Sequence, residues 1–302
     1  MTGSSRSIQT ETPVLKPDVA IILVNYKNAK DTLRCIGSIS RMSYGKHMVV
    51  VVDNASNDGS YELIKESTVP VTILRSDQNV GFAAACNLAI DFLKSQAPSY
   101  VWLLNNDTVV DEHALAHLVA KAESGTHIGA VGSKILDLSN TSRVLCVGGG
   151  LISCLTGVSQ HVTAYAKDLS LDYICGASLL IRWRAIVSVG PLREDYFLYW
   201  EDADYCARLA RSNWALALAE ESVVYHAEST TVGKKSTRFD YFFSRASVIF
   251  VREHFKYHWP VPLLISLGGR LVRRLFTKNL AGARAILKGT LHGVAGKLQR
   301  PS

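Results

Sequence analysis

The sequence lacks three patterns that would assign it quickly to a class of protein. Its six cysteines are scattered along 302 residues with no Cys-x-x-Cys pair, so neither a zinc site nor a disulfide framework is expected. The thiols are interpreted as reduced, as in the cytosol. The longest apolar runs reach only about half of a membrane span, and the first 18 residues lack the apolar core of a signal peptide. We therefore expect a protein that is soluble or lies on a membrane without crossing it.

Acidic residues are missing from the end of the chain. Nine of the 33 Lys and Arg lie between residues 254 and 302, where there is no Asp or Glu. The remainder is close to neutral, so a body that binds nucleic acid is not expected. A composition of 48% hydrophobic and 20% charged residues is that of a globular protein. The length allows one large domain with an appendage, or two small domains.

Apolar runs alternate with amphipathic segments over the first half of the chain. Unbroken apolar runs predict buried strands, and apolar residues spaced three or four apart predict helices. The expected strands cover residues 18–26, 48–52, 71–75 and 100–105, and the helices between and after them end at residues 39, 66, 94 and 123. This alternation predicts an α/β fold with a doubly wound, mostly parallel sheet and right-handed crossovers.

The second half has a different pattern. Strands are expected at residues 173–181 and 214–225, whereas residues 146–166 are expected to be irregular or short-stranded. Three helices are expected between residues 240 and 300. The middle one, Val261–Phe276, carries Arg270, Arg273 and Arg274 beside many apolar residues. It either binds an anionic membrane surface or packs on the main domain with solvated arginines, and both alternatives stay open.

Polar clusters follow three of the predicted strands, at Asn25-Tyr26, Asp53-Asn54 and Asn105-Asn106-Asp107. Open α/β sheets bind ligands outside the carboxyl ends of their strands, and we expect these clusters to meet at that edge. The Asp107 carboxylate could hold a divalent cation, which in turn could hold phosphate oxygens. Asn and Asp are also ordinary turn formers, so turns are the alternative. The first strand has no Gly-x-Gly-x-x-Gly after it, which argues against a dinucleotide-binding dehydrogenase.

Three further groups could take part in chemistry. Asn79-Val80-Gly81-Phe82 starts a helix whose amides could face phosphate, unless it is only a tight turn. Asp202 is crowded by Glu201 and Asp204, and crowded acids often mark a functional site, although acids also stabilise helix N-termini.

Asp204 is spaced to pair with Arg208 on the helix surface. His226 ends a strand and is either a metal ligand or a structural histidine.

Together these motifs resemble the inverting glycosyltransferases of family 2, which have the GT-A fold. The resemblance covers residues 19–255 and is carried by the segments VAIILVNYKN, VVVDNASNDGS, NVGFAAACNLAI, YVWLLNNDTVV, YICGASLLI, FLYWEDADYCARL and VVYHAES. Bacterial rhamnosyltransferase-like and galactofuranosyltransferase-like members are the most similar. The implied domains are a flexible tail of residues 1–17, a GT-A domain of residues 18–255, and a basic amphipathic helical region of residues 256–302.

The resemblance implies a role for each site residue. The residues that would bind the nucleotide sugar are Asn25, Tyr26, Asp53, Asn79, Gly81, Asn105 and Asn106, with Asp53 at the nucleobase. Asp107 and His226 would hold Mg²⁺ or Mn²⁺, and Asp202 would be the catalytic base. Trp200 and Glu201 would line the acceptor site. The sequence departs from the family pattern at Asn105, which replaces the first acid of the Asp-x-Asp motif and removes one charge from the metal site.

The resemblance implies transfer of a sugar from a nucleoside-diphosphate sugar, with dTDP-L-rhamnose as first choice, to a hydroxyl of a glycan or lipid-linked glycan in cell-surface polysaccharide synthesis. The protein would be cytoplasmic and peripheral at the inner face of the cell membrane, bound there through its C-terminal region, and would not bind nucleic acid. The oligomeric state stays open.

This interpretation has several alternatives. They are a UDP-galactofuranose or UDP-hexose donor, a catalytically decayed binding protein, a nucleotidyltransferase and a glycoside hydrolase. A nucleotidyltransferase would normally carry a Gly-rich basic loop after the first strand, and a hydrolase would not need the nucleotide-side cluster.

Overall fold

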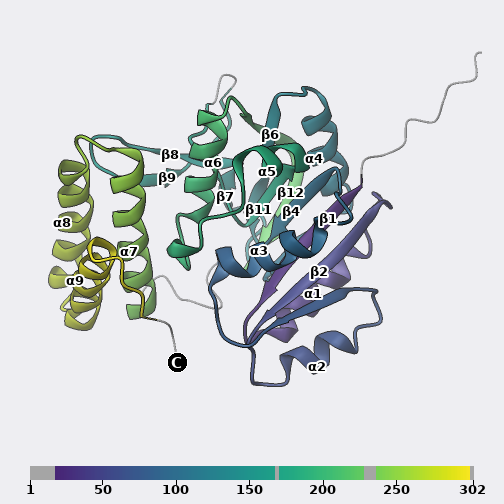
Figure 1. Cartoon of the computed structure of the whole chain (residues 1–302), viewed down its shortest axis with the longest axis horizontal. Helices are drawn as coiled ribbons and strands as arrows, with labels where there is room; N and C mark the ends of the chain where they lie inside the picture. Colours follow the sequence, from purple (N-terminus) through teal and green to yellow (C-terminus); the bar gives the residue numbers. More distant parts are fainter. Residues whose placement is uncertain (1–17, 167–169, 228–235, 300–302) are drawn as a thin grey trace, which may run out of the picture.

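A mixed β-sheet forms the centre of the computed structural model, which describes residues 18–166, 170–227 and 236–299 (Figure 1). The predicted flexible tail of residues 1–17 lies outside these residues. The strands lie in the order β3-β2-β1-β4-β11-β6-β12-β5, and β7 pairs with β6 outside this path. Their bounds are β1 Val19–Asn25, β2 His47–Asn54, β3 Thr72–Ser76, β4 Tyr100–Leu104, β5 Thr108–Val110, β6 Ile128–Asp137, β7 Val144–Val147, β11 Ser178–Arg182 and β12 Ala215–His226.

The sheet is mostly parallel, which confirms the predicted architecture. β1 pairs in parallel with β2 and β4, β2 with β3, and β6 with β12. β11 runs antiparallel between β4 and β6, and β5 runs antiparallel beside β12 at the edge. These antiparallel directions were not predicted, because a strand's apolar pattern does not tell which strand will lie beside it.

Helices cover both faces of the sheet and bury the apolar strands between them. One face is covered by α1 Ala29–Ile39, α2 Ser60–Lys65 and α4 Ala114–Glu123. The other is covered by α3 Phe82–Leu93, α5 Trp183–Val189 and α6 Glu201–Arg211, with the short 3-10 helix Glu194–Tyr196 before α6. With both faces closed, the edge formed by the carboxyl ends of β1, β2 and β4 is left open for a ligand.

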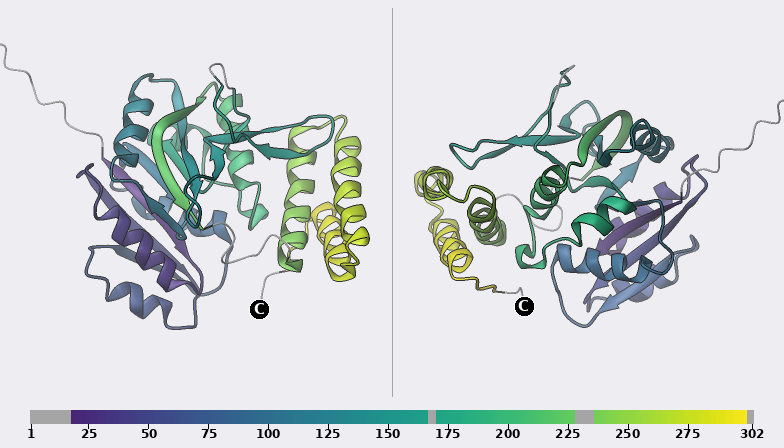
Figure 2. Two further views of the ribbon diagram at one scale, coloured as in Figure 1. Left: turned by 180° about the vertical axis from the view of Figure 1, so that it is seen from behind. Right: turned by 45° about the horizontal axis from the view of Figure 1, so that its top comes forward.

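A small second sheet extends from the main sheet toward the C-terminal helices (Figure 2). It consists of β8 Gly149–Ile152 between β9 Ser159–His161 and β10 Tyr173–Ile174. Gly157, in the turn between β8 and β9, lies against Pro262. This arm falls largely in the segment that was expected to be irregular or short-stranded, and short strands are what it contains.

The last three helices are α7 Thr237–His254, α8 Pro260–Phe276 and α9 Leu280–Val294, as three helices were predicted in this region. α7 packs closely on α9, because Gly289 and Gly293 let the α9 backbone approach the α7 backbone at Tyr241 and Arg245. The predicted domain boundary at residue 255 separates α7 from α9, although these two helices pack against each other. The boundary stays a prediction.

Two of the three arginines of α8 point neither to solvent nor to a membrane surface, which are the two places that the alternatives gave them. Arg270 and Arg274 donate hydrogen bonds to the carboxylate of Asp240, which is buried in α7, at distances of 3.3 and 2.8 Å. Arg273 alone of the three is exposed. A buried carboxylate needs a paired cation, so these two arginines connect α8 to α7 and are withdrawn from solvent.

Among the described residues, no helix combines the length and the apolar character that crossing a bilayer requires.

Candidate active site

The polar clusters at the strand ends meet at one edge of the sheet, as predicted. Asn25 of β1 lies opposite Asp53 of β2, and its Nδ2 donates to Asp53 Oδ1 at 2.9 Å. Thr32 of α1 donates to Asn25 Oδ1 at 2.8 Å, and Asn106 donates to the Thr32 hydroxyl at 2.8 Å. A continuous hydrogen-bonded network thus connects the ends of three strands, which fixes their loops relative to one another.

Asp53 lies beneath this surface and not in it. Its side chain is fully buried, and its second oxygen accepts a hydrogen bond from the backbone of Ser56 at 3.1 Å. Asn25 is fully buried as well. Direct contact of Asp53 with a nucleobase would require these hydrogen bonds to be exchanged, so the role assigned to Asp53 stays a prediction.

Asn54, which follows Asp53, organises the start of helix α3. Its Oδ1 accepts from the backbone N–H of Val80 at 2.9 Å, and its Nδ2 donates to Asn79 Oδ1 at 3.1 Å. The N–H of Gly81 donates to the Asn79 side chain, and that of Phe82 donates to the carbonyl of Phe197 at 2.7 Å. The N–H groups of Val80, Gly81 and Phe82 are therefore already bonded within the protein. This is the geometry of a tight turn, and phosphate binding by the amides of this helix stays a prediction.

Gly81 is required by a close approach of two backbones. It has a φ of +90°, and a Cβ at this position would come within 2.4 Å of the carbonyl oxygen of Phe197. Phe197, Tyr199 and Trp200 themselves have positive φ, at 68°, 71° and 67°. Backbone strain of this kind costs energy and clusters at functional sites. The start of α3 therefore holds the strained segment 197–200 against the edge of the sheet.

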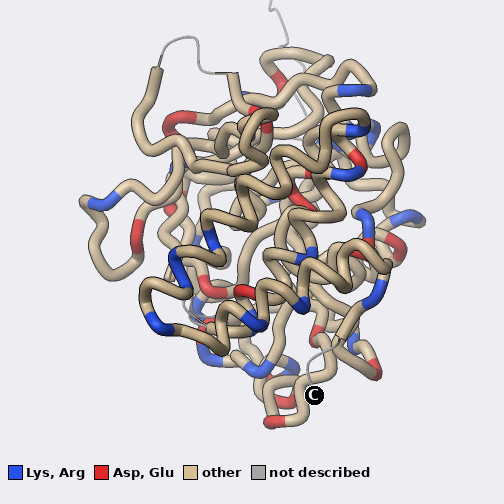
Figure 3. The backbone as a smooth tube through the Cα atoms, turned by 90° about the vertical axis from the view of Figure 1, so that its left-hand side faces the viewer, with Lys and Arg blue, Asp and Glu red and all other residues tan. Residues whose placement is uncertain are grey.

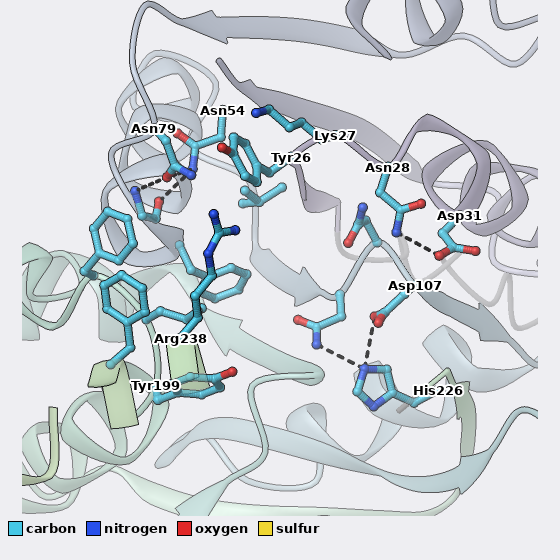
Figure 4. Close-up of a pocket in the computed structure, with 18 residues that line it drawn as sticks. Tyr26, Lys27, Asn28, Asp31, Asn54, Asn79, Asp107, Tyr199, His226 and Arg238 are labelled. Carbon is cyan, nitrogen blue, oxygen red and sulfur yellow. Dashed lines mark hydrogen bonds and ion pairs between the residues drawn. The ribbon is translucent and has the colours of Figure 1, made fainter. Parts of the chain in front are cut away.

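A cavity of about 550 Å³ opens between the sheet edge and this segment (Figure 4). Of the predicted nucleotide-binding residues it is lined by Tyr26, Asn79, Gly81, Asn105 and Asn106, together with the predicted metal ligands Asp107 and His226. Asn54, Lys27 and Arg238 line it too, and the sequence analysis assigned none of the three a role in binding. Lys27 and Arg238 add positive charge to its wall. Lys27 lies within the segment VAIILVNYKN, whereas Arg238 lies outside every segment that carries the resemblance and gives no sequence signal.

Asp107 and His226 meet in this cavity, although 119 positions separate them in the sequence. Antiparallel pairing places His226 of β12 opposite Thr108 of β5, directly after Asp107. Asp107 Oδ1 lies 3.0 Å from His226 Nε2, and the Asn105 amide lies 3.3 Å from the same nitrogen. A carboxylate oxygen and an imidazole nitrogen in contact fit a divalent ion, and Mn²⁺ accepts nitrogen more readily than Mg²⁺ does.

Asp202 lines a second, smaller cavity of about 250 Å³. Its carboxylate accepts hydrogen bonds from the backbone N–H groups of Gly176 and Ala203, each at 2.8 Å. Burial raises the pKa of Asp202, and these hydrogen bonds oppose the rise. A partly buried carboxylate with a raised pKa that faces a cavity is suited to accept a proton.

The other two acids of the cluster have different environments. Glu201 is buried, its Oε2 has no hydrogen-bond partner among the described residues, and burial with the charge of Asp202 raises its pKa. Asp204 accepts from Arg208 and His254 at 2.9 and 2.8 Å, and these partners lower its pKa against the effect of burial. The predicted Asp204–Arg208 pair forms, but Asp204 is fully buried and not on the surface. Asp202 is therefore the acid of the cluster that is least buried.

The two cavities share one wall. Phe82, Asn105, Leu198, Tyr199 and His226 line both of them. Trp200 and Glu201, predicted at the acceptor site, line the smaller cavity together with Asp202. The structure thus places the candidate metal ligand His226 between the nucleotide-side residues and the candidate base.

Comparison with known proteins agrees with this geometry. Residues 20–144 match Glycosyl transferase family 2, and residues 100–276, more than half of the chain, match Glycosyl transferase family group 2. The chain is 24% identical to the N-acetylglucosaminyl-diphospho-decaprenol L-rhamnosyltransferase of Mycobacterium tuberculosis, over 84% of this chain and 90% of that protein. It is 22% identical to a low-salt glycan biosynthesis hexosyltransferase of Haloferax volcanii, over 94% and 93% of the two chains.

The fold is shared with a solved structure of a mannosyltransferase from Pyrobaculum calidifontis in complex with GDP-Man and Mn²⁺. The TM-score is 0.61 at 16% sequence identity, and the match covers 95% of this chain and 78% of that one. The chain belongs to family 2 of the glycosyltransferases, and it is a glycosyltransferase with the GT-A fold.

Proposed function

We propose that this protein is an inverting, metal-dependent transferase that moves L-rhamnose from dTDP-L-rhamnose to a hydroxyl of a lipid-linked glycan. The observation that carries the proposal is the pair of cavities that meet at His226, one lined by the strand-end amides and the other holding Asp202. The relative from Mycobacterium tuberculosis, named as an L-rhamnosyltransferase of a diphospho-decaprenol acceptor, supports the choice of sugar and acceptor.

In this proposal the larger cavity takes the nucleotide sugar. Tyr26, Asn79 and Asn106 contact the nucleoside, and Asn25 and Asp53 support their loops from beneath. Lys27 and Arg238 line the same cavity and offer positive charge to a diphosphate. Asp107 and His226, with the Asn105 amide beside them, would hold Mn²⁺ or Mg²⁺, which when bound supplies positive charge to the departing diphosphate.

The smaller cavity takes the acceptor hydroxyl. Trp200 and Glu201 line it, and Asp202 accepts the hydroxyl proton as the oxygen attacks the anomeric carbon. The new bond joins the acceptor oxygen to that carbon, and the bond to the phosphate oxygen breaks on the opposite face. The nucleoside diphosphate leaves with its electron pair, so the anomeric centre inverts and no covalent sugar–enzyme intermediate forms.

The donor is tested by calorimetric titration of the full chain with dTDP, UDP and GDP and their sugars, with and without Mn²⁺. We expect the dTDP series to bind most tightly, more tightly with Mn²⁺, and the metal effect to disappear in Asp107→Ala. Asp91→Ala, which removes an exposed acid of α3, is the control and should bind like the wild type. Tightest binding of UDP ligands would replace the donor by a UDP-sugar. No binding of any nucleotide would favour the decayed binding protein.

The acceptor side of the proposal includes contact with an anionic membrane surface. Apolar side chains are exposed along one face of the last two helices, here called the α8–α9 face: Val261, Leu264, Ile265, Val272, Leu275 and Phe276 on α8, and Leu280, Leu287, Leu291 and Val294 on α9. Arg273, Lys278, Arg284 and Lys288, in the same helices and the turn between them, are exposed. Figure 3 marks the positions of Lys and Arg along the backbone on this side of the molecule. An apolar face with basic neighbours suits the surface of an anionic bilayer.

Point variants test this surface better than a deletion, because removing α9 would uncover the face of α7 on which it packs. Replacing Leu264, Phe276 and Leu291 by Ser should lower binding to vesicles containing phosphatidylglycerol more than about 1000-fold, because each side chain loses about 1.5–3 kcal/mol of apolar burial and about 1.4 kcal/mol is a factor of ten. Val187→Ser on α5, an equally exposed apolar residue elsewhere, is the control. Unchanged sedimentation of the triple variant with vesicles would refute the membrane contact.

A further inference from the structure

A cluster of soft metal ligands lies at the junction of the main sheet and the arm. Cys146 comes from β7, His161 from β9, and Cys175 follows β10. Their ligand atoms, two sulfurs and one imidazole nitrogen, all lie within 4.8 Å of one another. These residues are 15 and 14 positions apart in the sequence, too far for a motif, and strand pairing alone brings them together.

The backbone around these three side chains is firmly held. Cys175 donates its N–H to the carbonyl of Gly148 at 3.0 Å, and the Cys146 sulfur lies 3.0 Å from the carbonyl oxygen of Gly149. His161 pairs with Gly150 across the arm, and the Tyr173 hydroxyl lies 3.3 Å from its Nδ1. A metal-binding histidine usually has such a partner, which sets the orientation of its ring.

We propose that Cys146, His161 and Cys175 form a binding site for a soft divalent cation, Zn²⁺ being the physiological candidate. Thiolate and imidazole ligands select Zn²⁺ and Co²⁺ over Mg²⁺ and Mn²⁺. With Zn–S bonds of about 2.3 Å in a tetrahedron, the two sulfurs would be about 3.8 Å apart, so the side chains need to move inward by about 1 Å at most. The site differs in ligand type from the Asp107–His226 pair.

The proposed site borders the cavity that contains Asp202. His161 and Cys175 both line that cavity. Gly176, the residue after Cys175, donates its backbone N–H to the Asp202 carboxylate at 2.8 Å. Three protein ligands with one open position are typical of zinc sites that exchange water or another ligand. A bound cation would therefore change the electrostatic potential at the proposed acceptor site.

The site is tested with Co²⁺, which reports thiolate ligands by its absorption. The full chain, reduced with a phosphine and freed of metal, is titrated with Co²⁺ and then with Zn²⁺. We expect a near-ultraviolet thiolate-to-cobalt band and visible bands of a tetrahedral ion that saturate at one equivalent, are lost on adding Zn²⁺, and persist in excess Mg²⁺.

Variants assign the ligands. Cys146→Ser and Cys175→Ser should abolish the near-ultraviolet band, and His161→Ala should weaken Co²⁺ binding at least tenfold. The matched control is Cys154→Ser, an exposed cysteine of the same arm, which should keep the band. His161 is exposed, so its variant is expected to fold even if a buried cysteine variant does not.

Absence of the band in the reduced wild type, its persistence in Cys175→Ser, or Co²⁺ binding by His161→Ala as tight as that of the wild type would overturn the proposal. Asp107→Ala should keep the band, so this result is independent of the proposed transferase mechanism.

Discussion

The two cavities that share His226 differ in the charge and the hydrogen bonding of polar groups in their walls. In the larger one, neutral amides of Asn54 and Asn79 are bonded to each other and to the backbone. In the smaller one, Glu201 and Asp202 are carboxylates whose pKa values are raised, first of all by burial. Satisfied neutral groups are rigid and do not titrate, whereas buried carboxylates are poised to exchange protons.

The difference separates recognition from chemistry within one site. A wall of interlocked amides can fix a nucleotide without changing its own charge when the diphosphate leaves. A carboxylate kept partly out of water gains in basicity, which suits the transfer of one proton at each turnover. We therefore expect a substitution in the smaller cavity to leave nucleotide binding intact, and a substitution in the larger cavity to leave proton transfer intact.

Asp202→Asn should have the largest effect. The amide retains the shape of the side chain but cannot accept the hydroxyl proton, so kcat should fall about 10³-fold. Because the change lies in the smaller cavity, the Kd of the dTDP ligand should stay within twofold of the wild type. Turnover and calorimetric titration measure the two effects. Near-normal turnover would remove Asp202 from the role of base.

Asn54→Ala is the counterpart in the larger cavity. It removes the acceptor of the Val80 N–H and a donor to Asn79, and should lower the free energy of unfolding by about 1–3 kcal/mol. Nucleotide binding should weaken as the start of α3 loosens. Urea unfolding and titration measure these changes, with Asn140→Ala in an exposed turn as control. An unchanged midpoint would show that the amide network does not hold this wall.

Asn105→Asp changes the shared wall. A second carboxylate beside Asp107 and His226 should tighten Mn²⁺ binding about tenfold, because the charge of the ligands tunes the affinity for hard cations. Isothermal titration with Mn²⁺ in the presence of dTDP measures it. Weaker binding in this variant would mean that Asn105 is not close enough to the ion to act on it.

Glu201→Gln tests the raised pKa in the smaller cavity through the dependence of stability on pH. Burial and the charge of Asp202 raise the pKa of Glu201 from 4.5 to about 8, so the folded state binds a proton that the unfolded state releases above pH 4.5. The free energy of unfolding of the wild type should therefore fall as the pH rises from 5 to 8, and that of the variant should fall by less over the same range. Urea midpoints at both pH values test this, with exposed Glu220→Gln as control. Equal slopes would contradict the raised pKa.

Strand-end residues were predictable because each followed an unbroken apolar run. Asn25, Asn105 and Asp107 lie where the runs end, and the parallel register of β1 and β2 places Asn25 opposite Asp53. What could not be predicted was the depth of each side chain. Asp53 and Asn54 are both buried, but only Asn54 of the two lines the cavity, and neighbouring polar residues at the end of a strand give no sign of which one will do so.

The C-terminal helices and the cysteines show the same limit. Periodicity predicted α8 and its apolar face, but not that Arg270 and Arg274 turn inward to Asp240. The scattered cysteines suggested no metal site, although Cys146 and Cys175 lie together with His161.

By itself the sequence determined the alternation of strands and helices, the sheet edge at which the site lies, and the family. These depend on local periodicity and on short motifs, which each segment carries within itself. The tertiary structure alone decided that β5 and β12 pair antiparallel and bring His226 to Asp107, and that segment 197–200 separates two cavities. Such contacts join residues more than a hundred positions apart, and they arise only when packing fixes which elements are neighbours.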